Sequence, residues 1–376
     1  MMSQHGIGII GYGGFGAFLH KSWSNLKGAS VIGIADQNVS NIPAGEFNIY
    51  DDWRKMIRDP LISIISIVTP PSTHAELAIA SMKAGKHVLI EKPLATNLTD
   101  AREIINVSEF TGMKATVNYM LRFNPIVQQV VKWSESGVFG QLRRAVVENY
   151  AQDESLPQDH WFWDESVSGG IAVEHAVHFL DLVDLFAMYP IKHVKGASHN
   201  RNEGQEDQVY INVLYENGLI ASHYHDFARP DIFESTTIRL LFDLLELELY
   251  GWIPIQGRVR AMVNPEIEKE IYKLPGFKVD QRYPYNNGNI QDSNFQKTAQ
   301  TIYCGGKPYK SYGMITGTFA LPDKKLDVYR FCVRSMIENL ITSIDNPHIK
   351  LNVSLEDGFD TLKTALTSRE SARAKY

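Results

Sequence analysis

The stretch GIGIIGYGGFG occupies residues 6–16 of the 376-residue chain. Its first five residues are glycine or isoleucine and predict a short buried strand. Gly11, Gly13 and Gly16 then follow the G-x-G-x-x-G spacing of a loop that leads from a strand into a helix and binds a pyrophosphate. The three glycines serve, in order, a tight turn, close approach of the backbone to phosphate, and close packing of helix on strand. The stretch therefore predicts a dinucleotide-binding domain.

Asp36 follows Gly16 by twenty residues and ends the next predicted strand, residues 31–35. A carboxylate at this place accepts hydrogen bonds from the adenosine ribose and repels a 2′-phosphate. Residues 37–38 are Gln-Asn, so no arginine follows to bind that phosphate. The pattern favours NAD as the cofactor. NADP stays possible, because the Ser and Asn at 40–41 could help to bind a phosphate. The alternative is a glycine-rich turn that binds no ligand.

The tripeptide Glu91-Lys92-Pro93 closes an apolar run, residues 87–90, that predicts another buried strand of the same sheet. A proline pushes the residue before it towards extended geometry, so we expect Lys92 at the carboxyl end of a parallel strand. Open α/β sheets bind their ligands at that edge. Lys92 is thus a candidate acid or base for hydride chemistry. The alternative is a surface lysine at a strand end.

Strands and helices alternate over the first third of the chain, which predicts a parallel, doubly wound sheet of the Rossmann type over residues 1–122. The predicted strands span residues 6–10, 31–35, 62–68, 87–91 and 114–119. From residue 123 to 376 strands dominate, and Asn217-Gly218 is a strong hairpin signal. We expect this second domain to be α+β, with a large, mostly antiparallel open sheet. Its predicted helices span residues 125–136, 170–187, 326–345 and 355–372, and residues 280–298 are expected to form a long loop.

Composition narrows the class of protein. The formal net charge of −6 argues against a nucleic acid or an anionic membrane as the main partner. The two cysteines, Cys304 and Cys332, favour a reducing compartment over a disulfide framework, and their spacing is not that of a metal site. No signal peptide or membrane span is recognisable, so we expect a cytoplasmic protein. We also expect no bound metal.

The chain resembles the Gfo/Idh/MocA family (glucose–fructose oxidoreductase, inositol dehydrogenase and rhizopine catabolism) over nearly its whole length. The matching stretches are residues 11–16, 69–71 with His74, 84–88, 91–93, 122–125, 169–170 with His178 and Asp181, 354–358, and 371–372. The resemblance implies NAD(P)-dependent oxidation or reduction of sugars, polyols or related small molecules. It also implies a homodimer or homotetramer.

The resemblance assigns roles to matching positions. Lys92 corresponds to the family's catalytic lysine, and His178 to its substrate-facing histidine. Arg122 opens the second domain at the crevice, where it would clamp a ligand or form a hinge ion pair. The expected cofactor contacts are Gly11, Gly13, Gly14, Phe15, Gly16, Asp36, Lys92 and Arg122, and the resemblance adds Thr69, Pro70, His74, Glu91 and Asn118.

The sequence departs from the family pattern next to His178. Many members carry an aspartate four residues before this histidine, with a glycine between them. Here those positions hold Glu174 and Ala176, and His175 is inserted. On an α-helix Glu174 and His178 would share a face, so Glu174 is expected to orient His178 or bind a second hydroxyl. A zinc site formed by Glu174, His175 and His178 is the less favoured alternative.

Several aromatic side chains are candidates for the wall of the substrate pocket, because aromatic faces pack on the C–H faces of sugars. Each has core packing as an equal alternative. The expected substrate contacts are Tyr119, Trp161, Trp163, His178 and His225, and residues 150–165 and 275–300 are expected to set specificity.

The sequence favours a sugar or polyol oxidoreductase, and three other functions stay open. The first is an NAD-dependent glycoside hydrolase of the same fold, which oxidises and re-reduces one carbon around an elimination. The second is an oxidoreductase for a non-sugar substrate. The third is a non-catalytic nucleotide sensor, against which an intact Lys92 and His178 argue.

Overall fold

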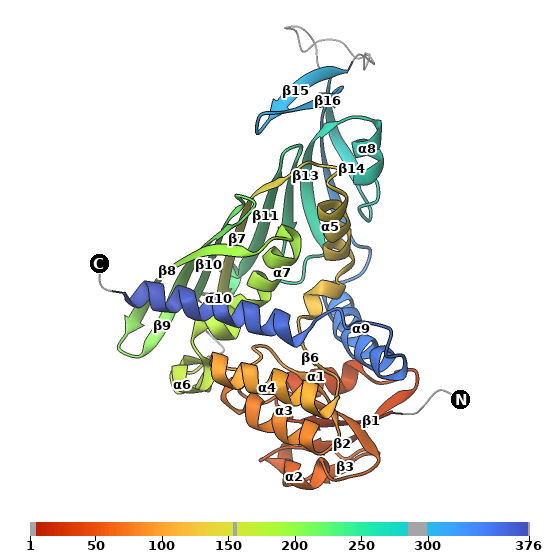
Figure 1. Cartoon of the computed structure of the whole chain (residues 1–376), viewed down its shortest axis with the longest axis vertical. Helices are drawn as coiled ribbons and strands as arrows, with labels where there is room; N and C mark the ends of the chain where they lie inside the picture. Colours follow the sequence, from red (N-terminus) through yellow and green to blue (C-terminus); the bar gives the residue numbers. More distant parts are fainter. Residues whose placement is uncertain (1–4, 153–155, 285–298, 375–376) are drawn as a thin grey trace.

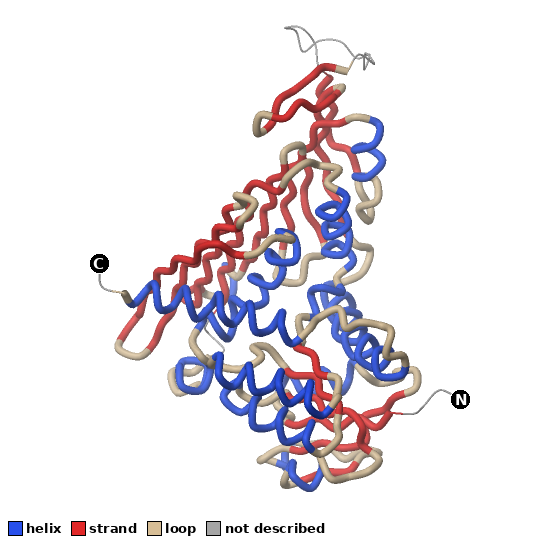
Figure 2. Tube along the Cα trace, in the orientation of Figure 1, coloured by secondary structure: helices blue, strands red, loops and turns tan. Residues whose placement is uncertain are grey.

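The computed structural model describes residues 5–152, 156–284 and 299–374. Two sheets organise these residues, a smaller parallel one near the N-terminus and a larger mixed one that extends away from it (Figure 1). Helices cover the smaller sheet and one face of the larger sheet (Figure 2). The predicted combination of a Rossmann domain with a largely antiparallel second sheet is confirmed.

The first sheet has the strand order β3-β2-β1-β4-β5-β6, and all its pairs are parallel. This is the order of dinucleotide-binding domains, in which the ligand lies at the carboxyl ends of the strands where the order reverses. The reversal falls between β1 and β4. The strands are β1 (His5–Ile10), β2 (Ala29–Ala35), β3 (Asn48–Tyr50), β4 (Ile62–Ile67), β5 (His87–Ile90) and β6 (Ala115–Val117).

Helices connect these parallel strands. Because crossovers are right-handed, the helix between β1 and β2 lies on the opposite face from those that follow β4 and β5. Their ends are well marked: Asn97 caps α4 by accepting from the Asp100 N–H at 2.9 Å, and Gly112 ends it in the left-handed conformation. The helices are α1 (Gly14–Ser22), α2 (Trp53–Met56), α3 (His74–Lys83) and α4 (Leu98–Thr111), with 3₁₀ turns η1 (Val39–Asn41), η2 (Pro71–Thr73) and η3 (Met120–Phe123).

The second sheet has the order β14-β17-β13-β12-β11-β7-β10-β9-β8 in the described residues. Its pairs are antiparallel except β7 with β10. A separate hairpin, β15–β16, projects beyond one end (Figure 1). The strands are β7 (Leu142–Gln152), β8 (Ile191–Asn202), β9 (Gln205–Tyr215), β10 (Ile220–Arg229), β11 (Ser235–Phe242), β12 (Leu245–Tyr250), β13 (Gln256–Val263), β14 (Lys278–Pro284), β15 (Gln300–Cys304), β16 (Lys307–Ser311) and β17 (Gly313–Ala320).

Alternating side chains explain why one face of this sheet is buried. In β12, Leu245, Leu247 and Leu249 are buried, whereas Glu246 and Glu248 point to the other face. Gly218 turns β9 into β10 in the left-handed region, as the hairpin signal predicted. Figure 1 shows α7 and α10 on the buried face. The expected loop 280–298 is wrong for its first residues, because β14 continues to Pro284, and residues 285–298 lie outside the described residues.

The helices of the second part of the chain include one irregular segment, the π-helical turn η5, directly before α7. None of the helices in the described ranges is long and apolar enough to span a membrane. The elements are α5 (Pro125–Ser136), α6 (Glu165–Ser168), η5 (Ala172–Ala176), α7 (Val177–Ala187), α8 (Pro265–Ile271), α9 (Lys325–Asp345) and α10 (Leu355–Arg373), with 3₁₀ turns η4 (Trp161–Trp163) and η6 (Asp231–Phe233).

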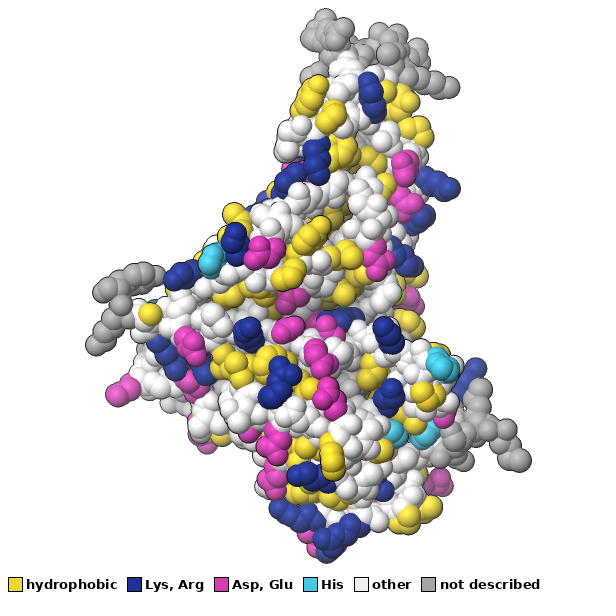
Figure 3. Space-filling model, viewed as in Figure 1, with side chains coloured by type: hydrophobic (Ala, Val, Ile, Leu, Met, Phe, Trp, Pro, Cys, Tyr) yellow, Lys and Arg dark blue, Asp and Glu magenta, His cyan; other side chains and the backbone are white. Residues whose placement is uncertain are grey.

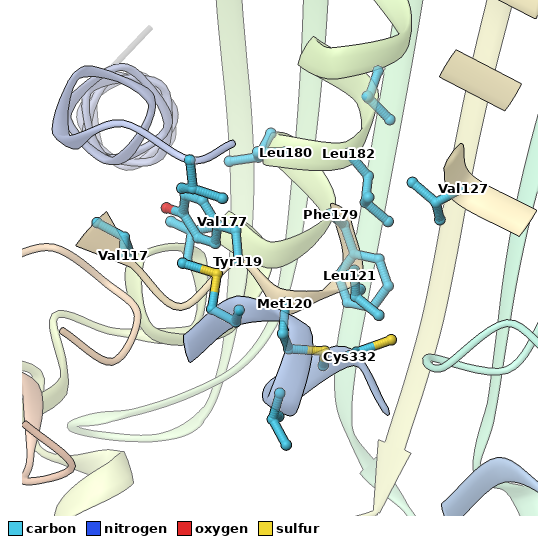
Figure 4. Packing of buried hydrophobic residues seen from close by; sticks show 14 of the residues in the cluster. Val117, Tyr119, Met120, Leu121, Val127, Val177, Phe179, Leu180, Leu182 and Cys332 are labelled. Carbon is cyan, nitrogen blue, oxygen red and sulfur yellow. The ribbon is translucent and has the colours of Figure 1, made fainter. Parts of the chain in front are cut away.

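The C-terminal helices return to the first domain. Trp23 donates its indole N–H to the carbonyl of Val333 in α9, at 3.1 Å, and Thr116 donates to the carbonyl of Val353 at 2.8 Å. Figure 4 shows the side chains of Leu121 and Phe179 close to Cys332, and that of Tyr119 beside Val177. The first domain is therefore completed by residues from the far end of the chain.

The surface shows no single sign of charge on the face drawn in Figure 3. Acidic side chains gather over the middle of the molecule, where α10 runs, and basic side chains are interspersed around them. Glu356, Asp357 and Asp360 are the acidic residues at the start of α10. This distribution agrees with the small negative net charge.

Candidate active site

The glycine loop lies between β1 and α1, as predicted, and two of its glycines are required by the protein's own packing. Gly11 has a φ of +95°, and a Cβ there would lie 2.6 Å from the carbonyl oxygen of Val68. A Cβ at Gly16 would lie 2.2 Å from the carbonyl oxygen of Gly11. No side chain fits at either position. These two glycines let α1 start close against β1.

Gly13 has a different reason to be glycine. Its φ of −71° suits any residue, and a Cβ there, or at Gly14, would meet no protein atom within 4 Å. Gly13 is the N-cap residue, and in the described part of the chain no side-chain hydrogen bond caps α1. Open space beside uncapped N–H groups at a helix N-terminus fits a phosphate group. The loop therefore fits the pyrophosphate of a dinucleotide.

These two kinds of glycine predict different mutant behaviour. Gly13→Ala is expected to change the unfolding free energy of the cofactor-free protein by at most about 1 kcal/mol. The same change should weaken dinucleotide binding about tenfold or more, because the new methyl group occupies the space beside the N–H donors. Gly16→Ala is expected to cost about 1–3 kcal/mol of stability through overpacking. Urea unfolding without cofactor, and a thermal-shift titration with NAD, measure both quantities. Equal losses of stability in the two variants would contradict this assignment.

Asp36 lies directly after β2, beside the glycine loop. Its Oδ2 accepts from the N–H of Tyr12 at 2.6 Å, and its Oδ1 accepts from the N–H of Asn38 at 2.7 Å. These two bonds hold the carboxylate in one orientation, and each oxygen keeps a lone pair for another donor. The arrangement fits the two hydroxyls of an adenosine ribose.

A cavity of about 460 Å³ opens between the carboxyl ends of the first sheet and the buried face of the second. Its volume is typical of small-molecule sites. Residues from both domains line it, and most are apolar or aromatic. The lining residues are Phe15, Val68, Thr69, Pro71, Glu91, Lys92, Asn118, Met120, Leu121, Asn149, Ala151, Gln152, Leu156, Trp161, Phe162, Glu174, His175, His178, Phe179, Phe227, Glu234, Trp252 and Tyr329.

Lys92 lies at the carboxyl end of β5 and reaches into this cavity. The Lys92–Pro93 bond is cis. The ammonium group donates to the carbonyl oxygen of Glu174 at 2.7 Å and forms an ion pair with the Glu174 carboxylate. Burial is the largest influence on Glu174 and opposes its ionisation, but the charge and hydrogen bond of Lys92 act together with His175 and His74 to keep the pKa of Glu174 below its usual value. A charged, oriented ammonium group therefore lines the cavity.

Asn118 and Glu91 form a second polar pair in the cavity. The Asn118 amide donates to Oε1 of Glu91, whose pKa burial raises to about 7. The Oδ1 of Asn118 is buried and has no hydrogen-bond partner among the described residues. A buried acceptor without a partner costs free energy, so this atom suits a donor group of a bound ligand. The carboxamide of a nicotinamide ring carries such a donor.

His178 also lines the cavity, on the first turn of α7. Burial and the charge of Lys92 hold its pKa well below the usual value, so the imidazole is neutral. Its Nδ1 is buried without a partner in the described residues. A neutral imidazole can accept a proton at one nitrogen. Lys92 and His178 thus lie in one cavity, as the sequence predicted.

The segment before His178 is not a regular α-helix. Residues Ala172–Ala176 form a π-helical turn, which holds one more residue per turn than α-helix, and such turns are common at functional sites. His175 lies in this turn. The expectation that Glu174 and His178 share one α-helical face is therefore replaced by a wider turn. Glu174, His175 and His178 all line the cavity from it.

Three expected substrate residues lie outside this cavity. Tyr119 is buried behind His178, and its hydroxyl is 2.5 Å from that of Thr361. Trp163 is buried with the guanidinium of Arg201 over its ring. His225 is fully buried, with its ring packed edge-on against His175. Core packing is the role that the structure supports for these three, whereas Trp161 lines the cavity.

His74 and Arg122 also differ from the expected cofactor set. His74 is fully buried, and its ring nitrogens lie 2.7 and 2.9 Å from the carbonyl oxygens of Pro93 and Thr69. It holds the loops that carry Lys92 and Thr69, and it does not line the cavity. Pro70, at the start of η2, does not line it either.

Of the two roles expected for Arg122, the structure shows the ion pair at the hinge, and Arg122 does not line the cavity that contains Lys92. Its guanidinium donates to the carboxylate of Asp181 at 2.6–3.1 Å and to the carbonyl of Asn352 at 2.9 Å, and it lies 3.0 Å from Asp357. Together with Lys192, these acidic residues border a separate hollow of about 580 Å³. Lys92 does not line this second hollow. Arg122 therefore ties η3 to α7 and α10.

Several other cavity residues carry no sequence signal. Asn149 and Phe227 come from strands of the second sheet, and Trp252 and Tyr329 come from parts of the chain far from any motif, whereas Gln152 falls within residues 150–165, which were expected to set specificity. His175 also had a signal, because it interrupts the family pattern. Among the described residues, no group of three or more His, Cys, Asp or Glu side chains is placed to hold a metal ion.

Comparison with known proteins identifies the family. Residues 5–119 match the model described as "Oxidoreductase family, NAD-binding Rossmann fold", and residues 127–239 match the "GFO/IDH/MocA C-terminal domain". The structure is similar to that of an oxidoreductase domain protein from Kribbella flavida. The TM-score is 0.75 at 16% identity, over 99% of this chain and 97% of that one. This likeness shows the fold.

Two curated relatives are dehydrogenases. Levoglucosan dehydrogenase of Pseudarthrobacter phenanthrenivorans is 32% identical over 139 residues, which are 36% of this chain and 35% of that protein. The scyllo-inositol 2-dehydrogenase (NAD(+)) of Bacillus subtilis is 24% identical over 222 residues, 56% of this chain and 64% of that protein. The chain thus spans less than two thirds of either relative. Both domain models and the fold agree that the chain belongs to the Gfo/Idh/MocA family of oxidoreductases, with an NAD-binding Rossmann domain.

Proposed function

We propose that the protein is an NAD-dependent oxidoreductase that interconverts a secondary alcohol and a ketone on a sugar, a polyol or a related small molecule. The observation that supports it best is the placement of Lys92 and His178. Both line one cavity at the carboxyl ends of the Rossmann strands, between the glycine loop and the second sheet. Named relatives that act on levoglucosan and inositol agree with this class of substrate.

The residues that would hold the cofactor are those whose geometry fits it. The N–H groups at the start of α1 would bind the pyrophosphate, Asp36 the adenosine ribose, and Asn118 the carboxamide of the nicotinamide. Bound NAD supplies an acceptor for the hydride of the alcohol carbon, and NADH supplies the donor in the reverse direction. Thr69 and Phe15 line the same cavity.

Lys92 would accept the hydroxyl proton in oxidation and donate it in reduction. Oxidation of an alcohol removes a hydride from carbon and a proton from oxygen, and the C–O single bond becomes a carbonyl. In the reverse direction the Lys92 ammonium group donates a proton to the forming alkoxide, which is general acid catalysis. Glu174 orients that ammonium group through its carboxylate and its carbonyl. His178, neutral in this site, would accept a hydrogen bond from the same hydroxyl or relay its proton.

A substrate panel tests this proposal. The purified protein is incubated with NAD or NADP and a series of sugars, inositols and sugar acids, and the absorbance of reduced nicotinamide is followed. Reduced cofactor is expected with one class of polyol or sugar. No reduction across the panel would contradict the proposal when a thermal shift shows that NAD binds. An NAD-requiring cleavage of aryl glycosides without net reduction would then identify the hydrolase alternative.

Asp36→Ala is expected to weaken NAD binding about tenfold or more, because the ribose hydroxyls lose a charged acceptor. NADP binding should weaken much less, since the same change removes the charge that repels its 2′-phosphate. Dissociation constants for both cofactors, measured by tryptophan fluorescence or calorimetry, check the ratio. Equal weakening of the two cofactors would contradict a ribose contact.

The oligomeric state expected from the resemblance, a homodimer or homotetramer, stays a prediction. The face of the large sheet opposite α7 and α10 carries half-exposed side chains such as Tyr210 and Ile220. Burial of this face between copies would remove apolar surface from water. Light scattering of the purified protein measures the state directly.

A further inference from the structure

His175 lies between Glu174 and Ala176, three residues before His178, and it is held in one orientation. Its Nε2 lies 2.8 Å from Oδ1 of Asn149, whose amide nitrogen in turn donates to the hydroxyl of Thr236 at 2.8 Å. An amide oxygen only accepts, so Nε2 of His175 carries the proton. Phe179 and Phe227 pack against the ring. The side chain is therefore preorganised.

The other ring nitrogen of His175 reaches the cavity. Burial lowers the pKa of His175 to about 4, so the ring is neutral near pH 7, and Nδ1 then carries a lone pair. The structure gives Nδ1 no hydrogen-bond partner among the described residues. Both ring nitrogens of His223 and His225 are fully buried and neither residue lines the cavity, whereas Nδ1 of His175 is not fully buried and His175 lines the cavity. A fixed acceptor without a donor thus faces the ligand space.

The charges around the cavity restrict what can bind. Among the described lining residues Lys92 is the only lysine, none is an arginine, and the charge of Lys92 is paired with the carboxylate of Glu174. Glu91 and Glu234 are the other carboxyl groups of this lining. A carboxylate or phosphate on the ligand would be buried without a cation of its own, which is unfavourable. The aromatic lining suits the C–H faces of a ring.

We propose that His175 binds a second hydroxyl of the substrate, distinct from the one that is oxidised, by accepting its hydrogen bond at Nδ1, and that the substrate is an uncharged polyol or sugar. This inference rests on the proposed oxidoreductase function. It assigns specificity to the residue that interrupts the family pattern. Lys92 and His178 contact the substrate hydroxyl that is oxidised, and His175 accepts a hydrogen bond from a different hydroxyl.

The test combines variants of His175 with deoxy analogues of the best substrate from the panel. For the wild-type enzyme, removal of one hydroxyl should lower kcat/KM about three- to tenfold, mainly through KM, which is the effect of one neutral hydrogen bond. His175→Phe should show the same loss on the parent substrate and no further loss on that analogue. A loss of equal size on parent and analogue would overturn the proposal, because it would show a structural role.

Two further variants make the result specific. His175→Gln keeps a polar acceptor in the cavity and should recover part of the loss, and it replaces the Phe variant if that protein does not fold. His225→Phe is the matched control, since His225 is a buried imidazole whose ring centre lies 5.5 Å from that of His175 and which does not line the cavity. Its effect should be the same on parent and analogue. An analogue-specific effect of His225→Phe would contradict the assignment.

The charge of the substrate is tested on the wild-type enzyme alone. Carboxylate and phosphate derivatives of the active polyol should react with a kcat/KM about 10- to 100-fold lower, as expected for a buried charge without a partner. A preference for an anionic derivative would overturn the proposal. If a neutral polyol is oxidised but the variants show no analogue-specific loss, only the role of His175 fails. If no substrate reduces the cofactor, the proposed function fails with it.

Discussion

Lys92→Met is expected to lower kcat by about 10²–10⁴-fold, the usual effect of losing a general acid or base. Binding of NAD should survive, because the proposed pyrophosphate and ribose contacts are at the glycine loop and Asp36 and do not involve the ammonium group. Methionine keeps most of the length of the side chain and removes the ammonium group with its charge and hydrogen bonds. Steady-state rates, together with NAD titration of the same preparation, measure both effects.

Lys92→Met is also expected to lower the unfolding free energy, so its loss of activity needs a matched control. Loss of Lys92 leaves the carboxylate of Glu174 without its cation in a site where both side chains are mostly buried, which costs about 3–5 kcal/mol. The double variant Lys92→Met/Glu174→Gln removes both charges and should recover most of that stability without recovering activity. Urea unfolding separates the two losses.

Two results would contradict the role given to Lys92. If the double variant were stable and active, Lys92 would not be the acid or base of the reaction. If the single variant lost NAD binding in proportion to its loss of rate, Lys92 would be a cofactor contact only. Retained binding with abolished turnover is the result that the cavity geometry leads us to expect.

Arg122→Met is expected to lower the unfolding free energy by about 3–5 kcal/mol, because two carboxylates lose their cation at the junction of the domains. Asp181 is almost fully buried, and its pKa is raised to about 6 by burial even with Arg122 beside it. The guanidinium also holds the Asn352 carbonyl and Asp357 at the start of α10. Its loss therefore weakens contacts between η3, α7 and α10 together.

Arg54 provides the matched control for this prediction. It forms an ion pair with Glu76 at 3.0 Å, but both side chains are more than half exposed. Arg54→Met should cost less than about 1 kcal/mol, since exposed ion pairs contribute little. Chemical denaturation of both variants measures the difference. Similar losses of unfolding free energy in the two variants would show that burial does not strengthen the Arg122 ion pairs. Weaker cofactor binding by Arg122→Met without a loss of stability would show that Arg122 binds the ligand.

The first domain was predictable because its signals are local. The glycine loop, Asp36 and the strand before Lys92 each depend on residues within one strand–helix unit, and the chain must place them at the carboxyl edge of a parallel sheet. The alternation of Leu245–Leu249 and the Asn217-Gly218 turn likewise determine strands and a hairpin from a few neighbours. The expectation of loop at 280–284 failed because strand pairing with β17, distant in sequence, overrides a polar composition.

The cavity was only partly predictable. Lys92, His178, Glu174 and Trp161 line it as expected, but Tyr119, Trp163 and His225 do not. The sequence pattern of an aromatic or a histidine is the same whether it faces a ligand or the core. That choice depends on how the residue before η3, the turn η4 and the strand β10 pack against the rest of the molecule.

The sequence by itself determined the class of fold, the glycine loop with Asp36 and the place of Lys92, because these follow from backbone conformation and short-range pattern. The tertiary structure alone decided which side chains share the cavity, because Asn149, Trp252 and Tyr329 approach Lys92 only after the second sheet and α9 pack on the first domain. It also placed His175, which lies in a π-helical turn, among the residues that line the cavity. Long-range packing sets such contacts, and no local pattern encodes it.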